Sequence, residues 1–296
     1  MQVIVPQEKD GMMLIQFLSQ TAGDVPLWAI KEAVKKRDVR IDGVRVERDV
    51  RLNAGQEVRV YWPKSVVAAQ KKEKILPAPE VVYEDGHVLL INKPQGIPSQ
   101  NEENPWIGDS ALTRVKAYLE KKGCTTDQLH LCHRLDVQTG GLLLFALTDA
   151  AFESALTAFA KRTFTKIYTC RVKGCPAQRE AVIRAYLRKD MQISRVSVTD
   201  YPARGAVEIT TGYRVIREEE NALLEVELIT GRTHQIRAHL AHIGHPILGD
   251  DKYGDHVLNR KLGLKKQQLW ATTLVFHADG VLGYLNGRVF SVQYPL

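Results

Sequence analysis

One carboxylate stands between basic residues and a glycine pair in the run from His133 to Leu143, which reads HRLDVQTGGLL. This carboxylate is Asp136, and the apolar residues Leu144 to Leu147 that follow have the length of a buried strand. We therefore expect Asp136 on a loop that enters the strand, where a rigid scaffold can aim a catalytic side chain. Taken alone, the motif also fits an Asp that only caps a turn beside glycines.

Further motifs follow one another along most of the chain. They are Glu84-Asp85, Asn92 to Gly96, His133 to Gly141, Lys166 to Tyr168, Gly231 to Arg237, Gly244 to Asp250, and Tyr253-Gly254. In this order and spacing they resemble the RluA-type pseudouridine synthases, which isomerise chosen uridines in ribosomal or transfer RNA. The resemblance implies an RNA isomerase that acts on structured RNA, either ribosomal RNA, first of all that of the large subunit, or transfer RNA.

The resemblance implies catalytic roles for three residues. Asp136 matches the family's catalytic carboxylate, and Arg237 matches the arginine that forms an ion pair with it. Such a pair keeps a carboxylate ionised and fixes its direction. Tyr168 matches the tyrosine that stacks on the displaced base or helps to move a proton.

The reaction breaks a glycosidic bond, turns the base and rejoins it through carbon 5. This isomerisation involves no net oxidation or hydrolysis, so we expect neither a metal nor any cofactor, nucleotide cofactors included. The sequence leaves open whether Asp136 attacks the sugar, attacks the base or removes a sugar proton. Each route requires the ionised carboxylate.

The residues around Arg237 and Tyr168 allow other interpretations. A helix from Thr233 to Gly244 would carry Arg237 beside its apolar stripe, but an arginine at such a position is often exposed. Tyr168 shares a predicted strand face with Cys170, so it also fits an ordinary core residue.

A uridine in a stacked RNA has to be flipped out before it can react, which costs a few kcal/mol. In some relatives the arginine before Leu-Asp fills the gap that the base leaves, which nominates Arg134, with His133 beside it. Ordinary phosphate contacts are the alternative for both residues. We expect further RNA contacts from the other shared motifs: Lys166, Arg232, His234 and Gln235.

The first 62 residues combine a basic helix with a basic hairpin. Leu27 to Arg37 has helical periodicity, and Asp42-Gly43 between apolar residues predicts a hairpin. The segment resembles the small S-four-type RNA-binding module, although basic residues can also form a merely solvated face. The expected RNA contacts here are Lys31, Lys35, Lys36, Arg40 and Arg45.

Composition then divides the chain into an RNA-binding module (1–62), a linker (63–80) and a catalytic domain (81–296). The alternation of short strands and helices after residue 81 predicts an α+β domain. The resemblance implies a mixed, mainly antiparallel sheet flanked by helices. Within this domain we expect a helix capped by Thr148 or Asp149, with apolar positions at Phe152, Leu156 and Phe159.

Bulk properties agree with a globular RNA-binding protein. Of the 296 residues, 44% are hydrophobic and 25% are charged, and the net charge of +7 suits a polyanionic partner. The four cysteines have no metal-ligand spacing, and no signal peptide or membrane span is evident. We therefore expect a cytoplasmic monomer with reduced thiols.

Two other site hypotheses are weak. His234, His239, His242 and His245 invite a metal interpretation, but on a helix they spread over a wide sector. Lys93-Pro94-x-Gly96 lacks the glycines of a phosphate-binding loop and predicts a strand that ends in a turn.

The chain also departs from common family residues. Val137 and Gln138 replace a frequent charged pair, Gly140 replaces a small hydroxyl residue, and Trp270 replaces a frequent His. Two rival functions remain at this point. A non-catalytic RNA-binding or ribosome-assembly protein would not need to retain Asp136, Tyr168 and Arg237, and a hydrolase or nuclease would normally need a second carboxylate or a metal.

Overall fold

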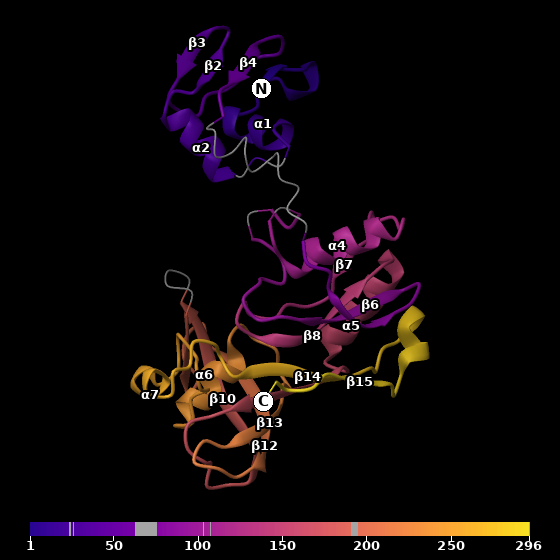
Figure 1. The fold of residues 1–296 in the computed structure, drawn as a ribbon, viewed down its shortest axis with the longest axis vertical. Helices are drawn as coiled ribbons and strands as arrows, with labels where there is room; N and C mark the ends of the chain where they lie inside the picture. Colours follow the sequence, from indigo (N-terminus) through magenta and orange to yellow (C-terminus); the bar gives the residue numbers. More distant parts are fainter. Residues whose placement is uncertain are drawn as a thin grey trace. The chain divides into compact units, whose positions relative to one another are not determined.

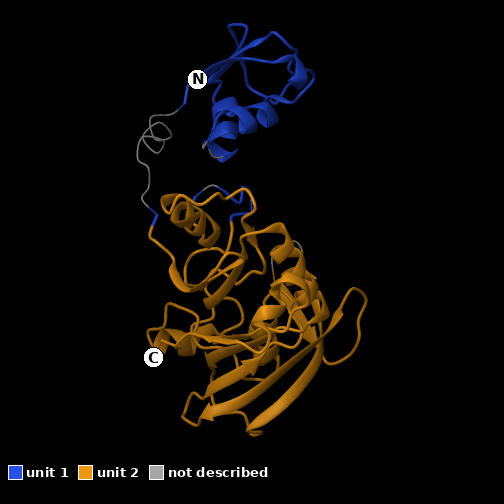
Figure 2. Ribbon diagram, turned by 90° about the vertical axis from the view of Figure 1, so that its right-hand side faces the viewer, with its two compact units in different colours: residues 1–76, 101–108 blue, residues 77–100, 109–296 orange. Residues whose placement is uncertain are grey.

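The computed structural model describes residues 1–23, 25, 27–62, 76–102, 104–106, 108–190 and 195–295. It divides into two compact units, residues 1–76 with 101–108 and residues 77–100 with 109–296 (Figure 2). Most of the predicted linker, residues 63–75, lies outside the described residues.

The first unit is a small antiparallel sheet with helices packed on it. Its strands pair in the order β1-β4-β2-β3. The elements are β1 (Gln2–Ile4), η1 (Gln7–Lys9), α1 (Leu14–Thr21), α2 (Leu27–Lys35), β2 (Val39–Ile41), β3 (Val44–Val46) and β4 (Glu57–Val60). Phe17 and Ile30 are fully buried between the helices and the sheet. The predicted hairpin is confirmed, because Asp42 and Gly43 both have positive φ between the paired strands β2 and β3.

An 11-stranded sheet organises the second unit, with the central order β11-β10-β12-β13-β9-β14-β8-β6-β5 (Figure 1). Its strands are β5 (Glu80–Glu84), β6 (Val88–Lys93), β7 (His130–Leu131), β8 (Gly140–Ala146), β9 (Thr165–Arg171), β10 (Glu180–Asp190), β11 (Arg195–Thr199), β12 (Val207–Arg217), β13 (Leu223–Glu227), β14 (Leu269–Val275) and β15 (Val289–Ser291). Strands β8 and β14 are parallel, whereas the other paired neighbours are antiparallel. The expected α+β fold with a mixed, mainly antiparallel sheet is therefore confirmed.

The helices lie on two cores that share the central strand β8. They are α4 (Ala111–Lys121), α5 (Asp149–Lys161), α6 (Gln235–His242), α7 (His256–Lys261) and the 3-10 helix η2 (Gly280–Leu285). Side chains alternate along β8, so Leu143 and Phe145 join the core of α4 and α6. Leu142 and Leu144 join the core of α5 and η2. Burial on both faces explains the continuous apolar sequence of this strand.

Helix α5 buries a different stripe from the one predicted. Thr148 caps it as expected, by accepting a hydrogen bond from the Ala151 N–H at 3.2 Å. The fully covered positions, however, are the alanines 151, 155 and 158, whereas Leu156 is 44% exposed. Phe152 and Phe159 only flank the core. The small alanine side chains face the sheet because they let the helix approach it closely.

Gly140 and Trp270, two departures from the family pattern, are spatial neighbours. They pair across the parallel strands β8 and β14. A Cβ atom on Gly140 would lie 2.3 Å from Cε2 of Trp270, so the indole ring occupies the space that a side chain at position 140 would need. The two departures therefore compensate each other.

We expect Gly140→Ser to lower the free energy of unfolding by about 1–3 kcal/mol, as overpacking of a tight site does. Adding Trp270→His should recover most of the loss, because the smaller ring vacates the space. Gly86→Ser is the control, since a Cβ on Gly86 meets nothing within 4 Å. Urea unfolding checks this, and a Gly140→Ser protein as stable as the wild type would contradict the compensation.

Candidate active site

Asp136 lies on the loop between β7 and β8, as the sequence predicts. Its backbone carbonyl accepts a hydrogen bond from the Thr139 N–H at 3.0 Å. On one side of Asp136 the Leu135 N–H donates to Ser99 Oγ at 2.9 Å, and on the other side the Val137 carbonyl accepts from the Gly96 N–H at 2.8 Å. These contacts fix the backbone around the carboxylate.

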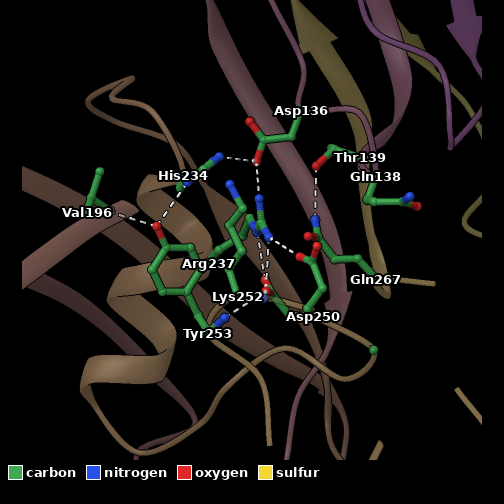
Figure 3. Close-up of polar contacts among 12 residues, drawn as sticks. Asp136, Gln138, Thr139, Val196, His234, Arg237, Asp250, Lys252, Tyr253 and Gln267 are labelled. Atoms are coloured by element: carbon green, nitrogen blue, oxygen red, sulfur yellow. Dashed lines mark hydrogen bonds and ion pairs between the residues drawn. The ribbon is translucent and has the colours of Figure 1, made fainter. Parts of the chain in front are cut away.

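Arg237 contacts this carboxylate from helix α6. Its Nη1 lies 2.9 Å from Asp136 Oδ2, although 101 positions separate the two residues in the chain (Figure 3). Arg237 is only 4% exposed. The alternative of an exposed helix arginine is therefore wrong, and the ion pair implied by the resemblance is present.

Two further carboxylates share the Arg237 guanidinium. Asp250 accepts from Nε at 2.7 Å and from Nη2 at 3.0 Å, and Asp251 accepts from Nη2 at 2.9 Å. Burial opposes the charge of Arg237, but the hydrogen bonds and charge of Asp250, together with Asp136, raise its pKa above the ordinary value. Burial would raise the pKa of Asp250, yet Arg237 and two backbone N–H groups lower it. The arginine and Asp250 therefore both stay charged.

His234 precedes α6 in a left-handed conformation, with φ of 54°. The helix thus begins at Gln235, two positions after the predicted start at Thr233. His234 Nδ1 lies 2.9 Å from the Tyr253 hydroxyl, and Nε2 lies 3.9 Å from Asp136 Oδ2. Burial lowers the pKa of His234, which favours the neutral ring.

Tyr168 lies on β9 and is 6% exposed. Its ring belongs to the core that contains Leu135 and Leu143, so its packing is that of a core residue. Burial raises the pKa of Tyr168, and the charge of Asp136 raises it further. The phenol is therefore neutral and within electrostatic range of the carboxylate.

Lys93 is part of this site, and sequence reasoning gave it no role. The predicted strand and turn are correct, since β6 ends at Lys93, but the side chain is fully buried. Its Nζ donates to the carbonyls of Pro94 at 3.1 Å, Ile97 at 2.9 Å and Val137 at 3.4 Å. Side chains two positions apart on a strand share a face, so Lys93 lies on the same face as the core residues Leu89 and Ile91. This alternation could have predicted from the sequence that Lys93 is buried.

The charge state of Lys93 should be visible in the pH dependence of stability. Burial lowers its pKa to about 8, partly offset by the charge of Asp136. Between this value and the ordinary 10.5, the unfolded chain binds the proton and the folded protein does not. The contribution of Lys93 to the free energy of unfolding therefore rises as the pH increases from about 8 to 10.5.

We expect the wild type to gain up to about 3 kcal/mol in unfolding free energy relative to Lys93→Met over that window. The difference in unfolding free energy between the two proteins removes the contributions of the other titrating groups, because both proteins contain them. Urea titrations at several pH values measure it, with Lys121→Met on the exposed end of α4 as control. A constant difference would show that Lys93 does not titrate there.

One of the predicted RNA contacts points inward instead. Gln235 is 2% exposed and bonds to Thr230 Oγ1 and the Thr210 carbonyl, a geometry that does not fit an RNA contact. His133 is half-buried; its Nε2 accepts a hydrogen bond from the Leu144 N–H at 3.2 Å, and burial lowers its pKa to about 3, so the ring is neutral. Local spacing could not reveal the side-chain direction.

The other candidates on the second unit are more accessible. Arg134 and Arg232 are exposed. Lys166 is half-buried, with Nζ 5.7 Å from the centre of the Phe159 ring, and burial lowers its pKa.

On the first unit, the basic side chains mostly face solvent. Lys31, Lys35, Lys36 and Arg45 are exposed. Lys36 forms an ion pair with Glu32 at 2.6 Å, and the half-buried Arg40 lies over the Tyr61 ring at 5.6 Å.

The histidines of the weak metal hypothesis each have a separate partner. His239 contacts Thr211, His242 contacts Asp200, and His245 contacts the Lys173 carbonyl. Among the described residues, no group of three or more His, Cys, Asp or Glu side chains could hold a metal ion. Within the same ranges, no helix is both long enough and apolar enough to cross a membrane.

Known proteins combine the same fold with similar sequences. The sequence profile of the family described as RNA pseudouridylate synthase matches residues 87–242. The chain is 30% identical to the ribosomal large subunit pseudouridine synthase C of Escherichia coli (strain K12) over 312 residues, which cover 99% of this chain and 92% of that protein. Its counterpart in Vibrio parahaemolyticus is 30% identical over 94% of this chain and 87% of its own length.

Solved structures agree on the fold. Human RNA pseudouridylate synthase domain containing 4 superposes with a TM-score of 0.59 at 24% identity, over 73% of this chain and 88% of that one. The chain belongs to the RNA pseudouridylate synthase family. It is an isomerase that converts uridine in RNA to pseudouridine.

Proposed function

We propose that this protein isomerises a uridine in large-subunit ribosomal RNA, with Asp136 as the catalytic carboxylate. The observation that carries the role of Asp136 is its 2.9 Å hydrogen bond from the buried guanidinium of Arg237, which fixes the direction of the carboxylate. The names of the relatives in E. coli and V. parahaemolyticus support the RNA class.

The geometry suggests different roles for the two carboxylate oxygens of Asp136: Oδ2 contacts protein side chains, and Oδ1 is left for the substrate. Arg237 and His234 both approach Oδ2. Within the described residues, Oδ1 accepts no protein hydrogen bond that would compete with a substrate. The flipped uridine would meet this oxygen, with the neutral Tyr168 as the aromatic partner of the displaced base.

RNA would be held by both units. Arg134, Arg232 and Lys166 are the candidates around the active site, and the basic face of the first unit supplies the others. We propose that this unit is an S-four-like RNA-binding module, joined by a linker to the catalytic domain. We further propose that the enzyme acts as a cytoplasmic monomer without a nucleotide cofactor.

Removing charge from the module should weaken RNA binding in a salt-dependent way. The combined change Lys31→Ala, Lys35→Ala and Arg45→Ala is expected to reduce the slope of log K against log salt by about 2 to 3, because each cation that contacts a phosphate contributes about 0.7–0.9. Fluorescence anisotropy at several salt concentrations measures this. The matched control replaces the same lysines by arginine and Arg45 by lysine, and an unchanged slope in the alanine variant would contradict the contact.

Tritium release from RNA labelled at uracil carbon 5 tests the substrate assignment. Large-subunit, small-subunit and transfer RNA from cells that lack the corresponding modifications are offered separately. Release from large-subunit RNA alone is expected, and the modified position is then mapped. Release only from transfer RNA would overturn the ribosomal assignment and leave the isomerase intact.

A further inference from the structure

The turn from Gly249 to Gly254 contacts both side chains that approach Asp136 Oδ2. Asp250 is fully buried and binds the Arg237 guanidinium with both carboxylate oxygens (Figure 3). Tyr253 binds His234 through its hydroxyl. A single short segment therefore holds two groups that belong to another element.

This turn is itself tightly built. The N–H groups of Lys252 and Tyr253 donate to Asp250 Oδ1 at 2.8 and 2.9 Å. Asn259 accepts from the Gly249 N–H at 2.7 Å and donates to the Asp250 carbonyl at 3.2 Å. A Cβ on Gly254 would lie 2.3 Å from the Asp250 carbonyl oxygen. Such a closed turn can hold its side chains in one direction.

The contacts of Tyr253 favour one tautomer of His234. The Tyr253 hydroxyl accepts the Val196 N–H at 2.9 Å, and its own proton is then available for His234 Nδ1, also at 2.9 Å. A neutral imidazole that accepts at Nδ1 carries its proton on Nε2. This N–H is on the nitrogen that lies 3.9 Å from Asp136 Oδ2.

Asp250 restricts Arg237 in a complementary way. A free guanidinium prefers to bind a carboxylate through two parallel N–H bonds, which would engage both oxygens of Asp136. Here Nε and Nη2 are directed to Asp250, so only Nη1 reaches Asp136, and it reaches Oδ2. The other oxygen is thus kept for the uridine.

We propose that Asp250 and Tyr253 are positioning residues, which hold Arg237 and His234 so that both direct their N–H groups at one oxygen of Asp136. This inference rests on the proposed catalytic role of Asp136. It assigns the turn a function in the rate of the chemical step and none in the affinity for RNA.

Single-turnover kinetics with saturating enzyme test the role of Asp250. Asp250→Asn should slow tritium release roughly 100-fold, the loss expected from a misplacement of about 1 Å, while the dissociation constant for RNA stays unchanged. Asp251→Asn is the matched comparison, because Asp251 contacts the same Nη2 atom with a side chain that is 67% exposed. It should slow release by no more than about fivefold. Equal losses in the two variants, or weaker RNA binding by Asp250→Asn, would overturn the proposal.

A double-mutant cycle tests Tyr253. Tyr253→Phe keeps the ring and removes the hydroxyl, and His234→Asn tolerates the left-handed backbone but is too short to reach Asp136. Each should slow release about tenfold, and the double variant should be no slower than His234→Asn alone, because Tyr253 acts through His234. Additive losses would show that Tyr253 acts elsewhere.

The outcomes separate this proposal from the proposed function. Activity of Asp136→Asn in the same assay would remove the basis of both, whereas an inactive Asp136→Asn with additive losses at Tyr253 and His234 would remove only the positioning role. If Asp250→Asn fails to fold, as judged by circular dichroism, the cycle at Tyr253 decides the proposal.

Discussion

Asp136→Asn is expected to abolish pseudouridine formation and to leave RNA affinity intact. The amide has the size of the carboxylate but no charge, so it can neither attack as a nucleophile nor remove a proton. Its carbonyl oxygen can still accept from Arg237, and the backbone of the loop is held independently by Ser99 and Gly96. The fold should therefore survive while the chemistry is lost.

Two measurements separate these effects. Tritium release should fall by at least about 1,000-fold, as the loss of a covalent or acid–base catalyst produces. Anisotropy should give the same dissociation constant for RNA as the wild type. Asp127→Asn, on an exposed turn, is the isosteric control. Substantial tritium release by Asp136→Asn would contradict the assignment of Asp136 as the catalytic residue.

Arg237→Met is expected to cost both stability and activity. Removing the guanidinium leaves the fully buried Asp250 without its partner, and breaking a buried ion pair costs about 3–5 kcal/mol. The pKa of Asp250, which Arg237 lowers in spite of burial, should then rise. A carboxyl with a depressed pKa stabilises the fold above its unfolded pKa of about 4 and loses this contribution as the pH falls through the folded value. The wild-type advantage over Arg237→Met should therefore shrink in acid.

A double variant separates stability from catalysis. Arg237→Met with Asp250→Leu replaces the pair by apolar side chains, which is often neutral for stability. We expect most of the unfolding free energy to return, whereas tritium release should stay low because Asp136 still lacks Arg237. Arg184→Met, an exposed change on strand β10, is the control. Recovery of activity in the double variant would show that Arg237 matters only for folding.

Local sequence was sufficient for elements whose residues interact with near neighbours. The hairpin at Asp42-Gly43 and the doubly buried strand β8 follow from backbone preference and from a continuous apolar run. The loop position of Asp136 follows in the same way. Periodicity was weaker evidence for α5. It predicted that the large apolar side chains are buried, whereas in the structure the alanines pack against the sheet.

The α+β class, the family motifs and the residue types of the site follow from the amino-acid sequence alone, because these depend on local pattern and order along the chain. Which side chains meet follows from the packing of the folded chain. Arg237 reaches Asp136 across 101 positions, Lys93 turns into the core, and Gln235 turns away from solvent. The physical reason is that the direction of a side chain is set by the elements packed around it, and those elements come from distant parts of the chain.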